Sequence, residues 1–129
     1  PPTTVRRQRQ MCIRDSKFCY KATTYETTKI IADKLNITSD KYIVSYQSRL
    51  FGKWLTPFTD EVLKSFAKDG HENVLIFSPA FTADCLETII ELGDEYKELF
   101  EENGGKNLDY VRSLNYSDLW VDAIIDIIK

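Results

Sequence analysis

One short stretch limits what this chain can fold into: the apolar run Val74–Phe77, which is followed at once by Ser78 and Pro79. An all-apolar run of this length that ends at a turn signal is typical of a buried strand in a parallel sheet. The residues after the turn predict a helix. Ligands of open α/β sheets bind beyond the carboxyl ends of the strands, which is where this turn lies. We therefore expect the functional residues in the segment that follows residue 77.

Three carboxylates recur in the predicted helix at four-residue steps: Glu87, Glu91 and Glu95. Four residues exceed one turn of an α-helix, so such a row drifts around the helix surface. A wider π-type turn would bring the three nearly into line, and such turns concentrate at functional sites. The alternative is a helix face that simply lies in water. The apolar positions of the helix are assigned to Leu86, Ile89, Ile90 and Leu92.

The segment Ala80–Thr88, which reads AFTADCLET, and the Asp94–Tyr96 that follows resemble the C-terminal part of the ferrochelatases, of the class II chelatase family. Further matches on both sides extend the resemblance over residues 17–129. Ferrochelatases insert ferrous iron into a porphyrin in the last steps of haem synthesis. The resemblance therefore implies an enzyme of the lyase class, with Fe2+ and protoporphyrin or coproporphyrin as substrates.

The resemblance also implies the fold. It predicts an α/β domain, a three-layer sandwich with a short parallel sheet, which is the C-terminal half of the chelatase fold. The first strand of that domain and the N-terminal domain of the same protein would be missing. In the family this strand carries a histidine in a Ser-x-His-Ser-x-Pro segment, which the 129 residues do not contain. The isolated fragment is therefore expected to be inactive.

By resemblance, Glu87 is the catalytic carboxylate that faces that histidine across the porphyrin. Glu91 and Glu95 would continue from it as an acidic path or an outer metal site. A carboxylate beside an apolar cleft can accept a pyrrole proton, and oxygen ligands bind a divalent ion without trapping it as thiolates would. No cofactor is expected to stay bound, ferrous iron is a substrate, and a divalent metal could occupy the acidic row. Cys85, where some relatives carry histidine, is interpreted as a packed thiol.

A second group of candidate residues follows the strand predicted over Lys41–Ser48. Gln47, Ser48 and Arg49 are hydrogen-bond donors at its carboxyl end, and Trp54 offers a flat apolar face. Donors beside an aromatic plane suit a porphyrin, which is a flat ring with carboxylate arms. The segment also resembles the family's Trp-Gln-Ser-(Lys/Arg) segment, although a tyrosine replaces the tryptophan. These four residues are the predicted porphyrin-binding set. The alternative is an edge loop whose tryptophan covers the core.

The rest of the chain alternates helical and strand patterns, which indicates parallel strands joined by right-handed crossovers. Helices are expected over residues 20–36, 59–69, through 96–100 and from residue 117 onward, with a last short strand over residues 108–111. The inner face of the last helix is assigned to Trp120, Ile124, Ile127 and Ile128. His71, the only histidine, precedes the buried strand at its amino end, so a catalytic role for it is not expected.

Residues 1–16 differ from the rest because they show no periodicity and offer few core residues. Met11–Ser16 resembles the translated end of a sequencing adapter. We therefore interpret residues 1–16 as a non-native head and residues 17–129 as the partial ferrochelatase-like domain. The alternative is a natural basic arm for an anionic partner.

Composition excludes several classes of protein. A net charge of −3 argues against a nucleic-acid-binding surface. No apolar run reaches membrane-spanning length, so only peripheral contact with a membrane stays open. The three cysteines show no paired metal spacing and favour a reducing compartment. The predicted location is the bacterial cytoplasm. Two other functions remain as alternatives: a cobalt chelatase of the same fold, and a non-catalytic haem- or porphyrin-binding α/β module.

Overall fold

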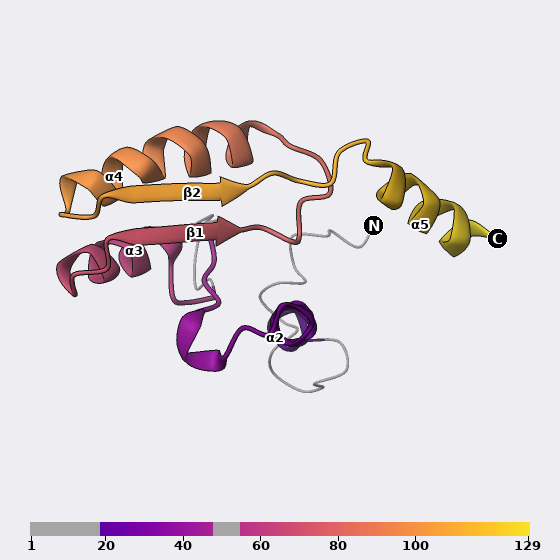
Figure 1. Ribbon diagram of the computed structural model, residues 1–129, viewed down its shortest axis with the longest axis horizontal. Coiled ribbons are helices and arrows are strands. Elements are labelled where there is room, and N and C mark those ends of the chain that lie inside the picture. The colour runs from indigo at the N-terminus through magenta and orange to yellow at the C-terminus, as the bar shows by residue number, and fades with distance from the viewer. Residues whose placement is uncertain (1–18, 48–54) are drawn as a thin grey trace, which may run out of the picture. The chain divides into compact units, whose positions relative to one another are not determined.

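The computed structural model describes residues 19–47 and 55–129, and the chain divides into two compact units, Pro1–Val62 and Leu63–Lys129. Figure 1 shows the helices and strands with their labels. Each unit is described by itself.

The first unit is mainly helical in its described part. Helix α2 spans Tyr20–Leu35, which confirms the helix predicted over residues 20–36. It ends at Asn36, whose left-handed backbone (φ 55°) allows its N–H to bond back to the last turn. A short 3-10 turn, η2, follows at Ser39–Lys41.

The strand predicted over Lys41–Ser48 is not formed in the described residues, which end here at residue 47. Only an isolated parallel bridge joins Tyr46 to Phe58. In it, the N–H of Tyr46 donates to the carbonyl of Pro57 (2.9 Å), and the N–H of Thr59 donates to the carbonyl of Tyr46 (3.1 Å). The β-forming side chains do favour extended backbone, as Tyr42 shows (φ −144°, ψ 157°). A strand also needs a partner along its length, which local propensity cannot supply.

The second unit contains the parallel sheet and the residues of helix α3 from Leu63 onward, since α3 spans Thr59–Lys68. Strand β1 is Asn73–Phe77 and β2 is Asn107–Val111. Between the strands lie the π-helix η3, Glu87–Glu95, and helix α4, Tyr96–Glu102. Helix α5, Asp118–Ile128, follows β2.

Strands β1 and β2 run parallel and in register, with Val74 opposite Leu108 and Ile76 opposite Tyr110 (Figure 1). These four residues share one face of the sheet, because alternate residues of a strand point to the same side. That face packs against residues of α3, η3 and α4. The buried members of this core are Leu63, Ala67, Leu92, Tyr96, Phe100 and Leu108. The predicted α/β class and short parallel sheet are confirmed.

The other face of the sheet is open to solvent in this structure. Leu75 is 66% exposed, and Phe77 and Val111 are also exposed. The prediction of a buried strand is therefore wrong for β1 within the described residues, where no β1 residue is fully buried. An apolar run cannot by itself say whether its second face is covered. The three-layer arrangement stays a prediction for the whole domain.

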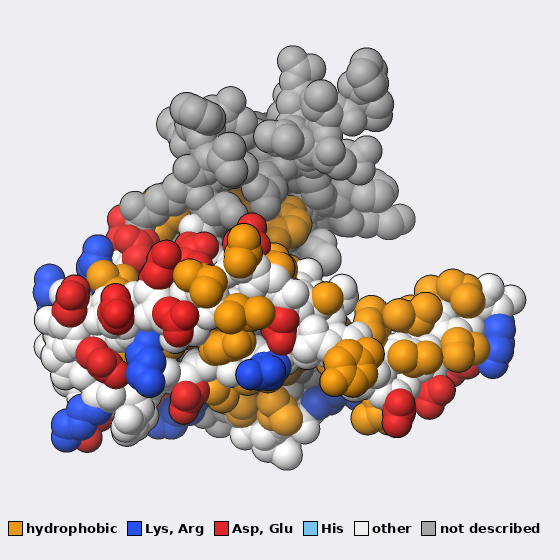
Figure 2. Space-filling model, turned by 90° about the horizontal axis from the view of Figure 1, so that it is seen from above, with side chains coloured by type: hydrophobic (Ala, Val, Ile, Leu, Met, Phe, Trp, Pro, Cys, Tyr) orange, Lys and Arg blue, Asp and Glu red, His pale blue; other side chains and the backbone are white. Residues whose placement is uncertain are grey.

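Helix α5 forms where it is predicted, but its apolar face is not buried. Ile127 and Ile128 are 77% and 75% exposed, Ile124 is exposed, and Trp120 is half-buried. Figure 2 shows hydrophobic side chains along this helix. The apolar stripe was correctly recognised, whereas its burial depends on a neighbour that the pattern does not reveal.

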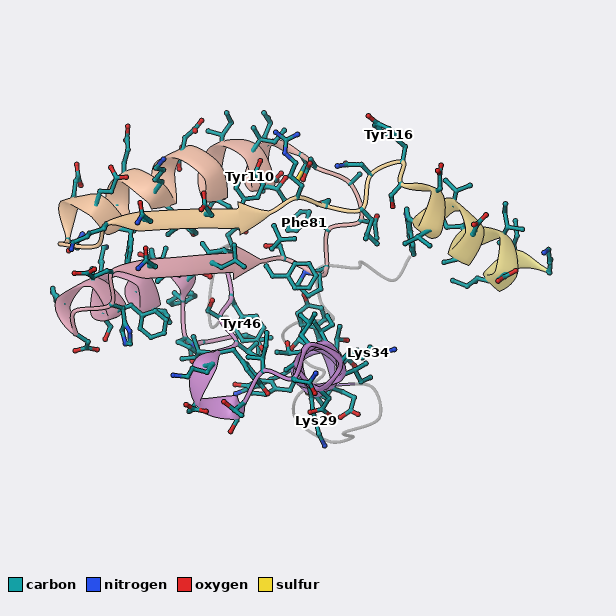
Figure 3. The ribbon with its side chains drawn as sticks, in the orientation of Figure 1. Lys29, Lys34, Tyr46, Phe81, Tyr110 and Tyr116 are labelled. Atoms are coloured by element: carbon teal, nitrogen blue, oxygen red, sulfur yellow. The ribbon has the colours of Figure 1, made fainter. Side chains whose placement is uncertain are left out.

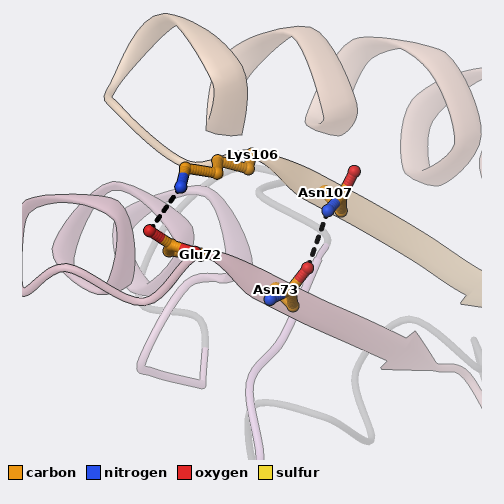
Figure 4. Close-up of polar contacts among 4 residues, drawn as sticks. All are labelled: Glu72, Asn73, Lys106 and Asn107. Carbon is orange, nitrogen blue, oxygen red and sulfur yellow. Dashed lines mark hydrogen bonds and ion pairs between the residues drawn. The ribbon is translucent and has the colours of Figure 1, made fainter.

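The amino ends of the two strands are joined by polar contacts (Figure 4). Lys106 forms an exposed ion pair with Glu72, and the side-chain amide of Asn107 donates to Asn73 (2.7 Å). His71 lies at this same end, with its ring against Phe66. The carboxyl ends of the strands lie at the opposite edge, so the predicted exclusion of His71 from a site there is consistent with its place in the fold.

Candidate functional site

The loops that leave the carboxyl ends of β1 and β2 are tied to each other. Residues 78–86 follow β1, and residues 112–117 follow β2. The N–H of Asn115 donates to the carbonyl of Thr82 (2.9 Å), and the N–H of Asp84 donates to the side-chain oxygen of Asn115 (2.9 Å). This is the edge of the sheet where the sequence predicts a site.

Asp84 lies at the centre of these contacts. Its Oδ1 accepts the backbone N–H of Ser113 (3.0 Å), and its Oδ2 accepts the side-chain amide of Asn115 (2.9 Å). The hydroxyl of Thr88 lies 3.3 Å from Oδ1. The hydrogen bonds from Asn115, followed by those from Ser113, lower the pKa of Asp84 to about 2. The side chain is therefore ionised at neutral pH, and donors surround its charge.

Thr88 connects Asp84 to the first turn of η3. Its side chain is only 2% exposed. Its Oγ1 accepts the N–H of Cys85 (2.9 Å), and its hydroxyl proton can be donated either to Asp84 or to the carbonyl of Cys85 (3.1 Å). The residues on both sides of Glu87 are thus held by hydrogen bonds.

The helix that carries the acidic row is a π-helix from Glu87 to Glu95, the wider turn that would bring the three glutamates nearly into line. The buried residues here and in α4 recur every four positions: Thr88, Leu92, Tyr96 and Phe100. Each of the three glutamates immediately precedes one of the first three buried residues. Because the buried stripe keeps this period, the glutamates recur on one flank of it.

The assignment of apolar positions in this helix was largely wrong. Leu92 is buried, but Leu86 is 76% exposed, and Ile89 and Ile90 are 46% and 42% exposed. Thr88 takes the inner position instead. The assignment assumed the α-helical period, whereas the π-helix turns less per residue and moves other positions inward.

A close approach to β2 helps to fix this helix. A Cβ atom on Gly93 would lie 3.0 Å from the ring of Tyr110. Tyr110 is labelled in Figure 3, on the strand beside the helix. A larger residue at position 93 would require the Tyr110 ring to give way slightly, so glycine suits this contact.

The three glutamates have different surroundings. Glu87 is exposed, and a hydrogen bond from Cys85 and one from its own backbone lower its pKa. Glu91 is half-buried and accepts the hydroxyl of Tyr96 (3.0 Å), whereas Glu95 is exposed. Cys85, interpreted as a packed thiol, is a free cysteine that is only half-buried.

Acidic side chains also gather over the neighbouring surface of α4 (Figure 2). Among the described residues, however, no three Asp, Glu, His or Cys side chains form a group that could hold a metal ion. Glu87, Glu91 and Glu95 are therefore successive separate carboxylates here. Their metal-binding role stays a prediction.

Of the predicted porphyrin-binding residues, only Gln47 belongs to the described part of the chain. It is half-buried and directly follows the bridge residue Tyr46. Tyr46 is held by its hydroxyl, which lies 3.0 Å from the hydroxyl of Thr24 in α2. Ser48, Arg49 and Trp54 lie outside the described residues, and Gln47 and Glu87 belong to different units.

Sequence reasoning gave no functional role to Asp84 or Asn115, the two residues that join the loops. Asp84 entered the sequence analysis only as one residue of the AFTADCLET motif. The sequence signal for Asn115 was an asparagine in the turn before a predicted helix. Asparagine readily adopts a left-handed backbone and favours such turns. It does have a positive φ of 50°.

Comparisons with known proteins agree on one family. The family model for ferrochelatase matches residues 5–129. The chain is 38% identical to a ferrochelatase of Idiomarina loihiensis over 112 residues, 85% of this chain and 30% of that protein. It is 41% identical to a ferrochelatase of Aliivibrio fischeri over 117 residues, 89% of this chain and 36% of that protein. It is also 40% identical to one of Coxiella burnetii, with 86% and 32% covered.

The chain thus spans about a third of the length of these relatives. Within the residues that the structure describes, no helix is both long enough and apolar enough to cross a membrane.

Proposed function

Because the chain belongs to the ferrochelatase family, we propose that it forms the C-terminal part of an enzyme that inserts ferrous iron into a porphyrin in haem synthesis. The complete protein, called the full-length enzyme below, would add an N-terminal domain and the other wall of a porphyrin cleft. We place the reaction in the bacterial cytoplasm, in line with the cysteine usage of the chain.

The position of Glu87 carries this proposal. It begins η3, beyond the carboxyl end of β1, at the edge where α/β sheets bind ligands. Its carboxylate is exposed, and its lowered pKa leaves it ionised and able to accept a proton at neutral pH. An apolar ring above it would raise its pKa again by desolvation, which makes it a stronger base when the substrate is bound.

The surface beside Glu87 suits a flat apolar ligand that takes up a metal ion. Exposed Leu86 and Ile90 provide apolar area close to the acidic row. Glu91 and Glu95 would act as successive weak oxygen ligands that pass the ferrous ion towards the ring. Gln47, Ser48, Arg49 and Trp54 are proposed to bind the porphyrin, with the donors directed to its carboxylates.

The test is Glu87→Gln in the full-length enzyme, which keeps size and polarity but removes the charge that accepts the proton. Turnover should fall roughly a hundredfold or more, the range of general acid–base catalysis. Porphyrin affinity, followed by absorbance titration, should change far less. Glu95→Gln should mainly raise the metal concentration that gives half-maximal rate.

The matched control is Glu101→Gln, because Glu101 is an exposed glutamate of α4 outside the row. It should leave both turnover and metal dependence unchanged. Near-normal turnover of Glu87→Gln at saturating metal would defeat the catalytic assignment. Tight porphyrin binding without metallation by the unmodified full-length protein would favour the non-catalytic module instead. Faster insertion of cobalt than of iron would favour the cobalt chelatase.

A further inference from the structure

We propose that Asn115 is a positioning residue, which holds the start of η3, and with it Glu87, through the carboxylate of Asp84. This inference rests on the proposed function, because porphyrin metallation is the reaction whose rate Asn115 would affect. The contacts that define it can be tested independently of that function.

The amide of Asn115 is matched to Asp84 at two points. Its oxygen accepts the N–H of Asp84, and its nitrogen donates to Oδ2 of the same residue, both at 2.9 Å. The nitrogen also donates to the carbonyl of Ser113 (3.0 Å). Only an amide side chain offers an acceptor and two donors in this arrangement. The left-handed backbone of Asn115 accompanies this geometry.

Asp84 carries the restraint from Asn115 to the helix. Its Oδ1, which accepts the N–H of Ser113, also lies within hydrogen-bond distance of the buried hydroxyl of Thr88. Thr88 in turn accepts the N–H of Cys85. These links form one continuous chain of contacts from the loop after β2 to the residues that flank Glu87.

Asp84 and Asn115 are distant in the chain, so the contact between them does more than form a local turn. Asp84 and Asn115 are 31 residues apart in the chain, and the bonds between them involve an ionised carboxylate. Hydrogen bonds to charged groups are shorter and stronger than neutral ones. A catalytic group displaced by about 1 Å can lose about a hundredfold in rate, so restraint at this point has a direct consequence for turnover.

The test uses Asn115→Gly in the full-length enzyme. Glycine adopts the left-handed backbone without strain, so the variant removes the amide and leaves the turn possible. Asn36→Gly is the matched control, since Asn36 has the same backbone conformation (φ 55°) in the other unit. We expect roughly a tenfold or larger fall in kcat for Asn115→Gly, with KM for porphyrin nearly unchanged. The control should leave both parameters as they are.

Hydrogen exchange measures the positioning without any assay of activity. The backbone amides of Cys85 and Thr88 do not contact Asn115, so a change there must pass through Asp84. Asn115→Gly should speed the exchange of these two amides, and Asn36→Gly should not. Exchange in β1 and β2 should remain slow in both variants, which separates local release of η3 from unfolding.

A swap of the two partners provides a second test if Asn115→Gly does not fold. Asn115→Asp places two carboxylates together, and Asp84→Asn places two amides together. The double variant Asp84→Asn/Asn115→Asp restores one amide and one carboxylate in exchanged positions. Its kcat should exceed that of both single variants, because the pair rather than either residue carries the restraint.

Unchanged exchange at Cys85 and Thr88 in Asn115→Gly would overturn the proposal, as would a double variant no better than the single variants. Faster exchange with normal kcat would overturn the positioning role, provided that Glu87→Gln is inactive. If Glu87→Gln itself has normal turnover, the proposed role of Glu87 fails, and the exchange data alone decide whether Asn115 holds η3.

Discussion

At the scale of single residues, Asp84 is a carboxylate whose charge is matched by neutral donors among the described residues. Asn115, Ser113 and Thr88 surround it, and none of them titrates near neutral pH. The folded state therefore favours the ionised form of Asp84. Its pKa, about 2, lies below the ordinary value of 3.8.

This pKa shift predicts a stability change in acid. The stabilisation from Asp84 is complete above pH 3.8 and is lost as the pH falls towards 2, because the unfolded chain then binds the proton more tightly. The thermal midpoint of the 129-residue chain should fall over this range. Asp84→Asn should remove this part of the pH dependence while leaving the part that other carboxylates cause. Identical slopes in both proteins between pH 4 and pH 2 would contradict the prediction.

At this scale, the sequence could predict residues that belong to a local motif, but not residues whose contacts join distant segments. Glu87 could be singled out because it belongs to a local row and motif, and its place at the carboxyl end of a strand followed from one apolar run. The Asp84–Asn115 pair could not, since it forms only when two loops meet across the sheet. The spacing of residue types along the chain reveals local periodicity, but it does not show which distant loops meet.

At the scale of elements, the π-helix sets the arrangement of the site. The buried row from Thr88 to Phe100 and the acidic row from Glu87 to Glu95 share a four-residue period, so one side of η3 meets the core while the flank beside it carries the acids. The continuation into α4 holds this row in place because Phe100 is fully buried against the sheet.

The tight turn after α4 depends on Gly105. A Cβ atom there would lie 2.2 Å from the ring of Phe100, far inside contact distance. Gly105→Ala should therefore destabilise the chain by about 1–3 kcal/mol, the usual cost of overpacking a core. Urea unfolding of the 129-residue chain measures this. In a Phe100→Leu background the ring is absent, so the same substitution should cost clearly less. An equal cost in both backgrounds would show that the ring is not responsible.

Elements were predictable where local pattern and tertiary neighbours agree. Helix α3 forms within the predicted range 59–69, with Leu63 and Ala67 buried, because the 3.6-residue period holds along it. The pattern failed over Lys41–Ser48, where extended backbone has only one bridge partner in the described residues. It failed again in η3, where a change of helical period moved Thr88 rather than Ile89 into the core.

At the scale of the whole molecule, the described residues leave much apolar surface uncovered. Leu75, Phe77 and Val111 on the sheet and the isoleucines of α5 are exposed. Large contiguous apolar patches mark interaction surfaces or sites of association. This pattern fits a chain that spans only about a third of the length of its relatives.

The last prediction concerns the activity of the 129-residue chain alone. In the proposed mechanism, metallation needs the porphyrin held between two walls and a second proton-transferring group opposite Glu87, and both effects multiply the rate. The chain has one histidine, His71, at the amino end of β1, away from Glu87. Zinc–porphyrin formation, followed by absorbance, should therefore be at least about a hundredfold slower than for the full-length enzyme. Circular dichroism must show the chain folded for this comparison. A folded chain that matches the full-length rate would mean that the 129 residues contain the complete catalytic site.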